Sequence, residues 1–241
     1  RVLGYLAVAA VIVQGVLGGL RVTMILDELG IFHGMLAQAY ISLLVVIAVA
    51  TSKAFATGGA RWRWHAPGLM RWALALTVLV YLQLGLGATM RHEHAGLSIH
   101  DFPLAYGQVW PMVDAEQLAV INAQRISSGE VPTTIGQITL QMLHRTMAVV
   151  LAALFLVYAW KARRAAMGVR LASRWWLALV VVQIALGAWT VWSGKAADVT
   201  TAHVAVGALI LFLGVAQCFL LGVFSPRAAE LKRETAKLVH A

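Results

Sequence analysis

Six long apolar stretches separated by polar connections dominate the pattern of this chain. The stretches cover residues 2–20, 31–50, 73–90, 138–160, 175–192 and 199–224. Each has about the 20 residues that a helix needs to cross the ~30 Å hydrocarbon core of a bilayer. The period-2 alternation typical of a membrane β-barrel is absent. The pattern therefore predicts an all-α, polytopic membrane helical bundle, with six transmembrane helices in this chain.

Composition and charge agree with this prediction. Hydrophobic residues make up 61% of the 241 residues and charged residues only 12%, whereas about 25% is usual in soluble domains. The alternative, a large soluble core, would need charges spread along helix faces, but they are confined to the connections. The net charge of +9 comes from basic residues at Arg1 and within 53–71, 161–174 and 227–237. Alternate connections carry the acidic residues, so the positive-inside rule predicts cytoplasmic termini and outward acidic loops. These basic patches indicate anionic lipid as a partner, and not nucleic acid.

A short phrase, Gln-x-x-Leu-Gly-(Gly/Ala), recurs inside three of the apolar stretches. It occupies residues 14–19, 83–88 and 183–188, and each copy is followed by a connection and an apolar stretch with a histidine near its start. These histidines are His33, His144 and His203. An ionisable side chain within a membrane segment costs free energy and usually has a function. Three of them at similar depth indicate a set of ligands.

Single histidines on facing helices suit an iron porphyrin, because the flat apolar disc fits between helices while imidazole nitrogens reach its iron. An interhelical hydrogen bond is the alternative for each histidine taken alone. No membrane helix carries a second histidine at i+4, so a His-x-x-x-His zinc site is not supported. The repeated glycines either pack helices closely or make room for a flat ligand or its ligating neighbour.

Arginines near the outer ends of the helices are candidates for binding propionate groups. Arg145 follows His144 directly, and its planar guanidinium would pair well with a carboxylate; snorkelling to the interface is the alternative. Arg21 and Arg91 have the same two possible roles. The neighbouring side chains of His92, Glu93 and His94 point apart in most conformations, which disfavours a metal site. The single cysteine excludes an intrachain disulfide.

The order of the helix pairs indicates a duplication. Hairpins 2–50 and 175–224 have short connections, whereas hairpin 73–160 contains a long outer loop, 91–137. A complete duplication would read long, short, long, short, so we expect a further hairpin before Arg1 and eight helices in two four-helix bundles. We therefore expect residues 1–52 to form the second half of the amino-terminal bundle and residues 73–224 to form the carboxyl-terminal bundle. Residues 53–72 would be a cytoplasmic linker, and residues 225–241 a cytoplasmic tail.

Taken together, these pieces resemble the heme A synthase family. They run through nearly the whole chain in the order of the family, and the outer-loop phrase with His-Arg is the most specific part. The matching residues are Gln14-x-x-Leu17-Gly18-Gly19, Arg21-Val22-Thr23, His33-Gly34-x-x-Ala37-Gln38, Leu86-Gly87-Ala88, Arg91, Ala95-Gly96-Leu97, Asp101-Phe102-Pro103-Leu104, Gln141-x-x-His144-Arg145, Gln183-x-x-Leu186-Gly187 and Thr201-Ala202-His203.

The resemblance implies an oxidoreductase that converts the C8 methyl group of heme O to a formyl group for cytochrome oxidase biogenesis. It implies heme b as a cofactor, with His144 and His203 as axial ligands of its iron and Arg145 beside it. Heme O, the substrate, would lie at His33 and Arg21. The implied partners are a heme O synthase, an electron donor and a second copy of the chain, in the inner (plasma) membrane of a bacterium.

The sequence departs from the family pattern in two respects. Members often carry a cysteine pair in the outer loops, whereas the equivalent stretch here reads Ser98-Ile99-His100, so a thiol role is absent. The catalytic carboxylate of the family belongs to the first hairpin, so no catalytic residue is assigned in this chain. Dihistidine ligation fits two other functions equally well: a membrane cytochrome b that transfers electrons, and a heme carrier or oxidase assembly factor.

Overall fold

The computed structural model describes residues 1–52 and 67–221, which form helices and irregular connections without a β-sheet. Within these residues, six helices are long and apolar enough to cross a membrane, which confirms the predicted fold class, a multi-pass membrane helical bundle. They are α1 (Val2–Met24), α2 (Asp27–Thr51), α4 (Pro67–His92), α6 (Ile135–Ala162), α7 (Met167–Trp192) and α8 (Ala197–Leu220).

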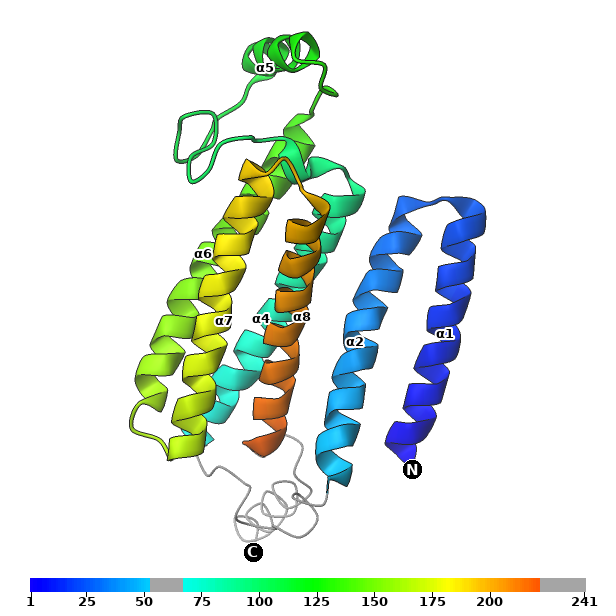
Figure 1. Cartoon of the computed structure of the whole chain (residues 1–241), viewed down its shortest axis with the longest axis vertical. Helices are drawn as coiled ribbons and strands as arrows, with labels where there is room; N and C mark the ends of the chain where they lie inside the picture. Colours follow the sequence, from blue (N-terminus) through cyan, green and yellow to red (C-terminus); the bar gives the residue numbers. More distant parts are fainter. Residues whose placement is uncertain (53–66, 222–241) are drawn as a thin grey trace, which may run out of the picture.

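Four of these helices form a bundle, and the other two stand beside it (Figure 1). Around the bundle, α4 packs against α6, α6 against α7, α7 against α8, and α8 against α4. Helices α6 and α8 therefore lie diagonally opposite each other, as do α4 and α7. Helix α2 packs against α4 and α8, and α1 packs against α2. The α1–α2 hairpin is thus attached to the bundle through α2.

A cluster of aromatic side chains forms the core of the four-helix bundle. The fully buried Trp176 ring makes edge-on contacts with Phe155 and Tyr158, at centroid distances of 4.6 and 5.5 Å. Its Nε1 donates a hydrogen bond to the carbonyl of Ile210 at 2.8 Å, which satisfies the polar end of the indole. A Cβ at Gly214 would lie 2.7 Å from Trp176 Cζ2, so only glycine fits there. These contacts hold α6, α7 and α8 together.

The helices extend beyond the apolar stretches because their end turns contain polar residues. Helix α2 already begins at Asp27, and α4 begins at Pro67, the first-turn position that proline favours. Residues 67–72, assigned above to the linker, are therefore helical. Residues 53–66 of that linker, the end of the last predicted stretch at 222–224 and the tail 225–241 lie outside the described residues.

The outer connection between α4 and α6 contains two short helices that the sequence analysis treated as loop. They are η2 (Ala95–Leu97) and α5 (Ala115–Ser127), and α5 lies at the outer extremity of the molecule (Figure 1). Asp114 caps α5 by accepting a hydrogen bond from Gln117 N at 2.8 Å. The connection is thus a folded cap on one end of the bundle.

Candidate functional site

Each predicted histidine lies against the repeated phrase of the preceding helix. A Cβ on the glycine that follows the leucine of the phrase would approach the imidazole Cε1 atom to about the closest distance that real Cβ contacts show. The three distances are 3.2 Å for Gly18 and His33, 3.3 Å for Gly87 and His144, and 3.1 Å for Gly187 and His203. The glycines therefore make room for the histidine rings.

The glutamine that opens each phrase contacts the same histidine. Gln14 Nε2 donates to the backbone oxygen of His33 at 3.0 Å and lies 3.4 Å from its ring Nε2. Gln83 Nε2 donates to the backbone oxygen of His144 at 2.9 Å and lies 3.2 and 3.4 Å from its Nδ1 and Nε2. Because glutamine and glycine are four residues apart, they share one helix face one turn apart.

The third copy repeats the contact between the glutamine amide and the histidine ring. Gln183 Nε2 lies 3.4 Å from His203 Nε2. The repeat made the glutamines recognisable in the sequence, but their contacts with the histidines were not predicted. Their invariant spacing from the glycine, which faces the ring, was the signal that could have identified them.

Two of the three histidines belong to one bundle. His144 on α6 and His203 on α8 come from diagonally opposite helices and lie within electrostatic range of each other. His33 lies on α2, in the separate hairpin. His33 and His203 occupy the same position in their helices, since each comes six residues after the first helical residue, Asp27 or Ala197.

Several buried polar atoms at these histidines have no hydrogen-bond partner among the described residues. They are Nδ1 of His33 and His203, and Oε1 of Gln14, Gln83 and Gln183. Each unsatisfied buried polar group typically costs about 1–3 kcal/mol. These unused donors and acceptors all lie around the histidine rings, where a bound group could satisfy them. No group of three or more His, Cys, Asp or Glu side chains suited to a metal ion occurs within residues 1–52 and 67–221. Paired imidazoles without carboxylates fit an iron porphyrin better than a bare metal ion.

The outer loop is fastened directly to the helix that carries His144. The buried Gln141 Oε1 accepts a hydrogen bond from Ile99 N at 2.8 Å, and its Nε2 donates to the carbonyls of Gly96 and Ile99, both at 3.2 Å. One turn further along, Arg145 donates to the carbonyls of Leu104 and Ile99 at 3.0 and 3.3 Å. Gln141 and Arg145 therefore fix the loop above the histidine.

Aromatic and acidic side chains hold the same loop in shape. The Arg145 guanidinium lies 5.5 Å from the centroid of the Phe102 ring, which packs edge-on against Trp192 of α7. Asp101 accepts hydrogen bonds from the backbone N–H groups of Tyr106 and Gly107 at 2.8 and 2.9 Å. Burial raises the pKa of the Asp101 carboxyl, but these two bonds and the charge of Arg145 outweigh it and leave the pKa below its usual value.

Gln141→Leu is expected to loosen the loop. The substitution leaves the buried N–H and C=O groups of Ile99 without a partner, so the free energy of unfolding should fall by about 2–3 kcal/mol. Denaturant unfolding in detergent, followed by tryptophan fluorescence, measures this change, and proteolysis of residues 93–134 should become faster. Gln124→Leu, at an exposed position of α5, is the matched control. Equal stability of the two variants would contradict the role given to Gln141.

The hairpin α1–α2 is fastened to the bundle close to His33. Tyr81 Oη on α4 donates to the backbone oxygen of Met35 at 3.1 Å. At the outer end, His92 Nδ1 lies 3.3 Å from Asp27 Oδ1, and its ring lies directly against Gly30. Both contacts bring the His33 helix to α4, the helix whose glutamine serves His144.

Two other predicted binding residues lie at the surface of the molecule. Arg21 and Arg91 are exposed at the outer ends of α1 and α4. Arg125 on α5 binds Glu130 at 3.3 Å, and His100 Nε2 lies 3.1 Å from the same carboxylate.

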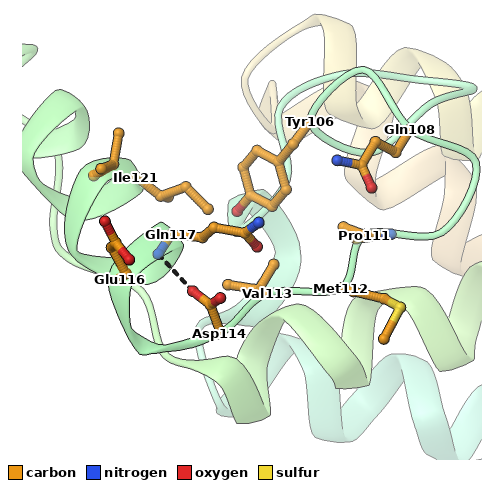
Figure 2. Close-up of a pocket in the computed structure, with 10 residues that line it drawn as sticks. Tyr106, Gln108, Pro111, Met112, Val113, Asp114, Glu116, Gln117 and Ile121 are labelled. Carbon is orange, nitrogen blue, oxygen red and sulfur yellow. Dashed lines mark hydrogen bonds between the residues drawn. The ribbon is translucent and has the colours of Figure 1, made fainter.

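A pocket of about 480 Å³ lies between α5 and the preceding loop (Figure 2). Its lining includes Tyr106, Met112 and Gln117 but none of the three histidines.

Fold and site together define a multi-pass membrane protein with histidines placed at matched positions by a repeated Gln–Gly phrase. Over residues 2–215 the sequence matches a family described as cytochrome oxidase assembly protein (COX15-CtaA). The chain belongs to this family, as its resemblance to heme A synthase predicted. It is 30% identical over 226 residues to a heme A synthase of Methylobacterium sp. (strain 4-46). The match covers 81% of this chain and 59% of that relative, so the chain spans less than two thirds of the relative's length.

Proposed function

We propose that this chain forms the heme b-binding bundle and part of the substrate half of a heme A synthase-type oxidoreductase. The proposal is carried by two imidazoles on diagonally opposite helices, His144 and His203. Each ring contacts a glycine and a glutamine of a neighbouring helix. Their ring nitrogens are the ligand atoms for one heme b. A heme b held by these two side chains would supply electron transfer at the site.

Arg145 has a double role in this proposal. Two of its donors hold loop carbonyls, and a guanidinium carries five N–H groups, so donors remain for a heme propionate. The loop that it fastens closes the outer end of the bundle above His144. Exclusion of water there strengthens the electrostatic interactions inside the site.

His33 and Arg21 are assigned to the substrate, heme O. His33 repeats the geometry of the other two histidines on a separate hairpin, which supports an iron-binding role there as well. Binding must leave the C8 methyl edge of heme O exposed to oxidation, which is a matter of positioning. We assign the catalytic carboxylate to a hairpin before Arg1, in a molecule of eight helices and two four-helix bundles. Residues 1–52 belong to the first bundle and 73–224 to the second.

The family resemblance implies a bacterial plasma membrane, and the charge distribution supports an orientation with both ends of this chain in the cytoplasm. The outer loop then lies on the opposite side of the membrane. A heme O synthase is the expected source of substrate, and an electron donor, anionic lipid and a second copy of the chain are the other proposed partners.

Heme analysis of cells tests the proposed activity. The full-length gene is expressed with a heme O synthase in a host that lacks its own heme A synthase, and extracted hemes are separated by chromatography. Heme A is expected with the native protein and not with His144→Ala. If the native protein is present in membranes with bound heme b but heme O alone accumulates, the protein is an electron-transfer cytochrome or a heme carrier instead.

A further inference from the structure

We propose that residues 109–112 of the outer loop rest in the interfacial layer of the bilayer, where neutral (zwitterionic) phospholipid covers them. We call this segment, Val109-Trp110-Pro111-Met112, the apolar tip. The inference goes beyond the proposed function, because it assigns a lipid-binding surface to the loop and depends on no bound heme.

The apolar tip exposes large hydrophobic side chains outside the membrane-spanning helices. Val109 and Met112 are 83% and 81% exposed, and Trp110 between them is 53% exposed. Residues 102–113 contain no Asp, Glu, Lys or Arg. Contiguous exposed apolar side chains mark a surface that binds protein or membrane. The depth of the tip and the charges around it indicate which of the two it binds.

The segment that leads to the tip lies at the level where helix α7 ends. The Phe102 ring packs edge-on against Trp192, the last residue of α7, at a centroid distance of 5.9 Å. Trp192 and Trp189, about one turn earlier, are both more than half exposed. Exposed tryptophans at the end of a membrane helix are typical of the membrane–water interface. The contact with Phe102 therefore places this part of the loop at interfacial depth.

A second contact, on α6, indicates a similar depth. Leu104 offers its carbonyl to Arg145 at 3.0 Å. Arg145 comes ten residues after Ile135, the first residue of α6, which is about 15 Å along the helix axis. The chain thus runs down beside α6, whereas α5 stays at the outer extremity, and the loop extends sideways from the bundle below α5 (Figure 1). The tip can therefore reach lipid beside the helices.

A preformed turn presents the tip. Ala105 and Gln108 exchange two backbone hydrogen bonds, at 2.7 and 3.0 Å. Inside the turn, Asp101 accepts hydrogen bonds from the backbone N–H groups of Tyr106 and Gly107. The tip follows directly after Gln108, so its direction is set before lipid contact. A surface that is ordered in advance loses less conformational entropy when it binds.

The charges around the tip select the kind of lipid. The tip has no lysine or arginine, the side chains that attract anionic headgroups. It is followed by Asp114 and Glu116 at the start of α5, and these carboxylates repel anionic headgroups. The contact between Phe102 and Trp192 also makes the loop continuous with the exposed tryptophans of α7. This continuity favours neutral lipid over a separate protein as the partner.

Spin labels measure the depth of the tip. Val109→Cys and Met112→Cys are made singly in an otherwise cysteine-free full-length protein, labelled with a nitroxide and placed in phosphatidylcholine nanodiscs that hold one copy each. Electron paramagnetic resonance with power saturation then measures collisions with oxygen, which concentrates in lipid, and with a water-soluble nickel chelate. The reference labels are at Gln124, exposed on α5, and at Val181, exposed in the middle of α7.

Both labels on the tip are expected to collide with the nickel chelate several-fold less often than the label at Gln124. Their collision rate with oxygen should lie between the rates at Gln124 and Val181. Val109→Asp, combined with the label at Met112, should raise nickel collisions toward the Gln124 value, because a carboxylate is costly to bury away from water. Gln124→Asp, combined with the same label, is the matched control and should change neither rate.

Three results would overturn the inference. Nickel collisions at Val109 and Met112 equal to those at Gln124 would show that the tip lies in water. Protection from nickel without a gain in oxygen collisions would show that protein, and not lipid, covers the tip. Protection that appears only when phosphatidylglycerol replaces phosphatidylcholine would contradict the assignment to neutral lipid. None of these results bears on heme binding, so the proposed function is tested separately.

Discussion

His144→Ala and His203→Ala are each expected to abolish the low-spin heme b spectrum of the protein. Each substitution removes one of the two imidazoles that the bundle brings together from diagonal helices. The remaining ligand leaves an open position on iron, so the absorption spectrum should change to a high-spin form. Removing a residue that hydrogen-bonds a metal ligand lowers affinity roughly 10–100-fold. Removing the ligand itself should lower the affinity for hemin by more than this.

His100→Ala is the control for these two variants. His100 lies in the outer loop, where its exposed imidazole contacts Glu130, and it is not assigned to heme. The control should retain the native spectrum and affinity. A native spectrum in either His144→Ala or His203→Ala would contradict the ligand assignment.

Gly87→Val and Gly187→Val are expected to displace the same ligands without removing them. A Cβ at either position already lies 3.3 or 3.1 Å from the ring Cε1 atom, and valine adds two methyl groups that the helix cannot turn away. Overpacking of this kind costs about 1–3 kcal/mol, which corresponds to roughly 5–150-fold in the dissociation constant for hemin. Titration of the full-length protein with hemin measures the change.

Neighbouring glycines provide controls with the same substitution. Gly85 lies on α4 two residues before Gly87, and a Cβ there would meet only the flexible end of the Met35 side chain, at 3.4 Å. Gly85→Val should therefore bind hemin much as the native protein does. Equal losses of affinity in Gly85→Val and Gly87→Val would mean that the loss comes from helix propensity and not from contact with the ring.

The helices were predictable from the sequence because lipid requires long, uninterrupted apolar segments with internally bonded backbones. Their ends were less predictable. The first turn of α2 contains Asp27 and Glu28, and no count of apolar residues detects such polar turns. The histidines and the glycines opposite them were recognisable because a repeat places them at constant spacing.

What the sequence did not reveal depends on contacts between segments far apart in the chain. The bond between Gln141 and Ile99 joins residues 42 positions apart, and no local pattern predicts it. Arg145 was expected at a propionate, whereas the structure adds two loop carbonyls and the Phe102 ring to its partners. The glutamines were visible as letters of a repeat, but their role follows only from where the next helix packs.

Electron paramagnetic resonance of the ferric full-length protein, purified with its bound heme, shows whether α6 and α8 present His144 and His203 to a single heme b. A low-spin signal of two axial imidazoles is expected from this heme, and it should be lost in both alanine variants. A high-spin signal from heme b in the native protein, or a low-spin signal that survives in either alanine variant, would contradict this arrangement.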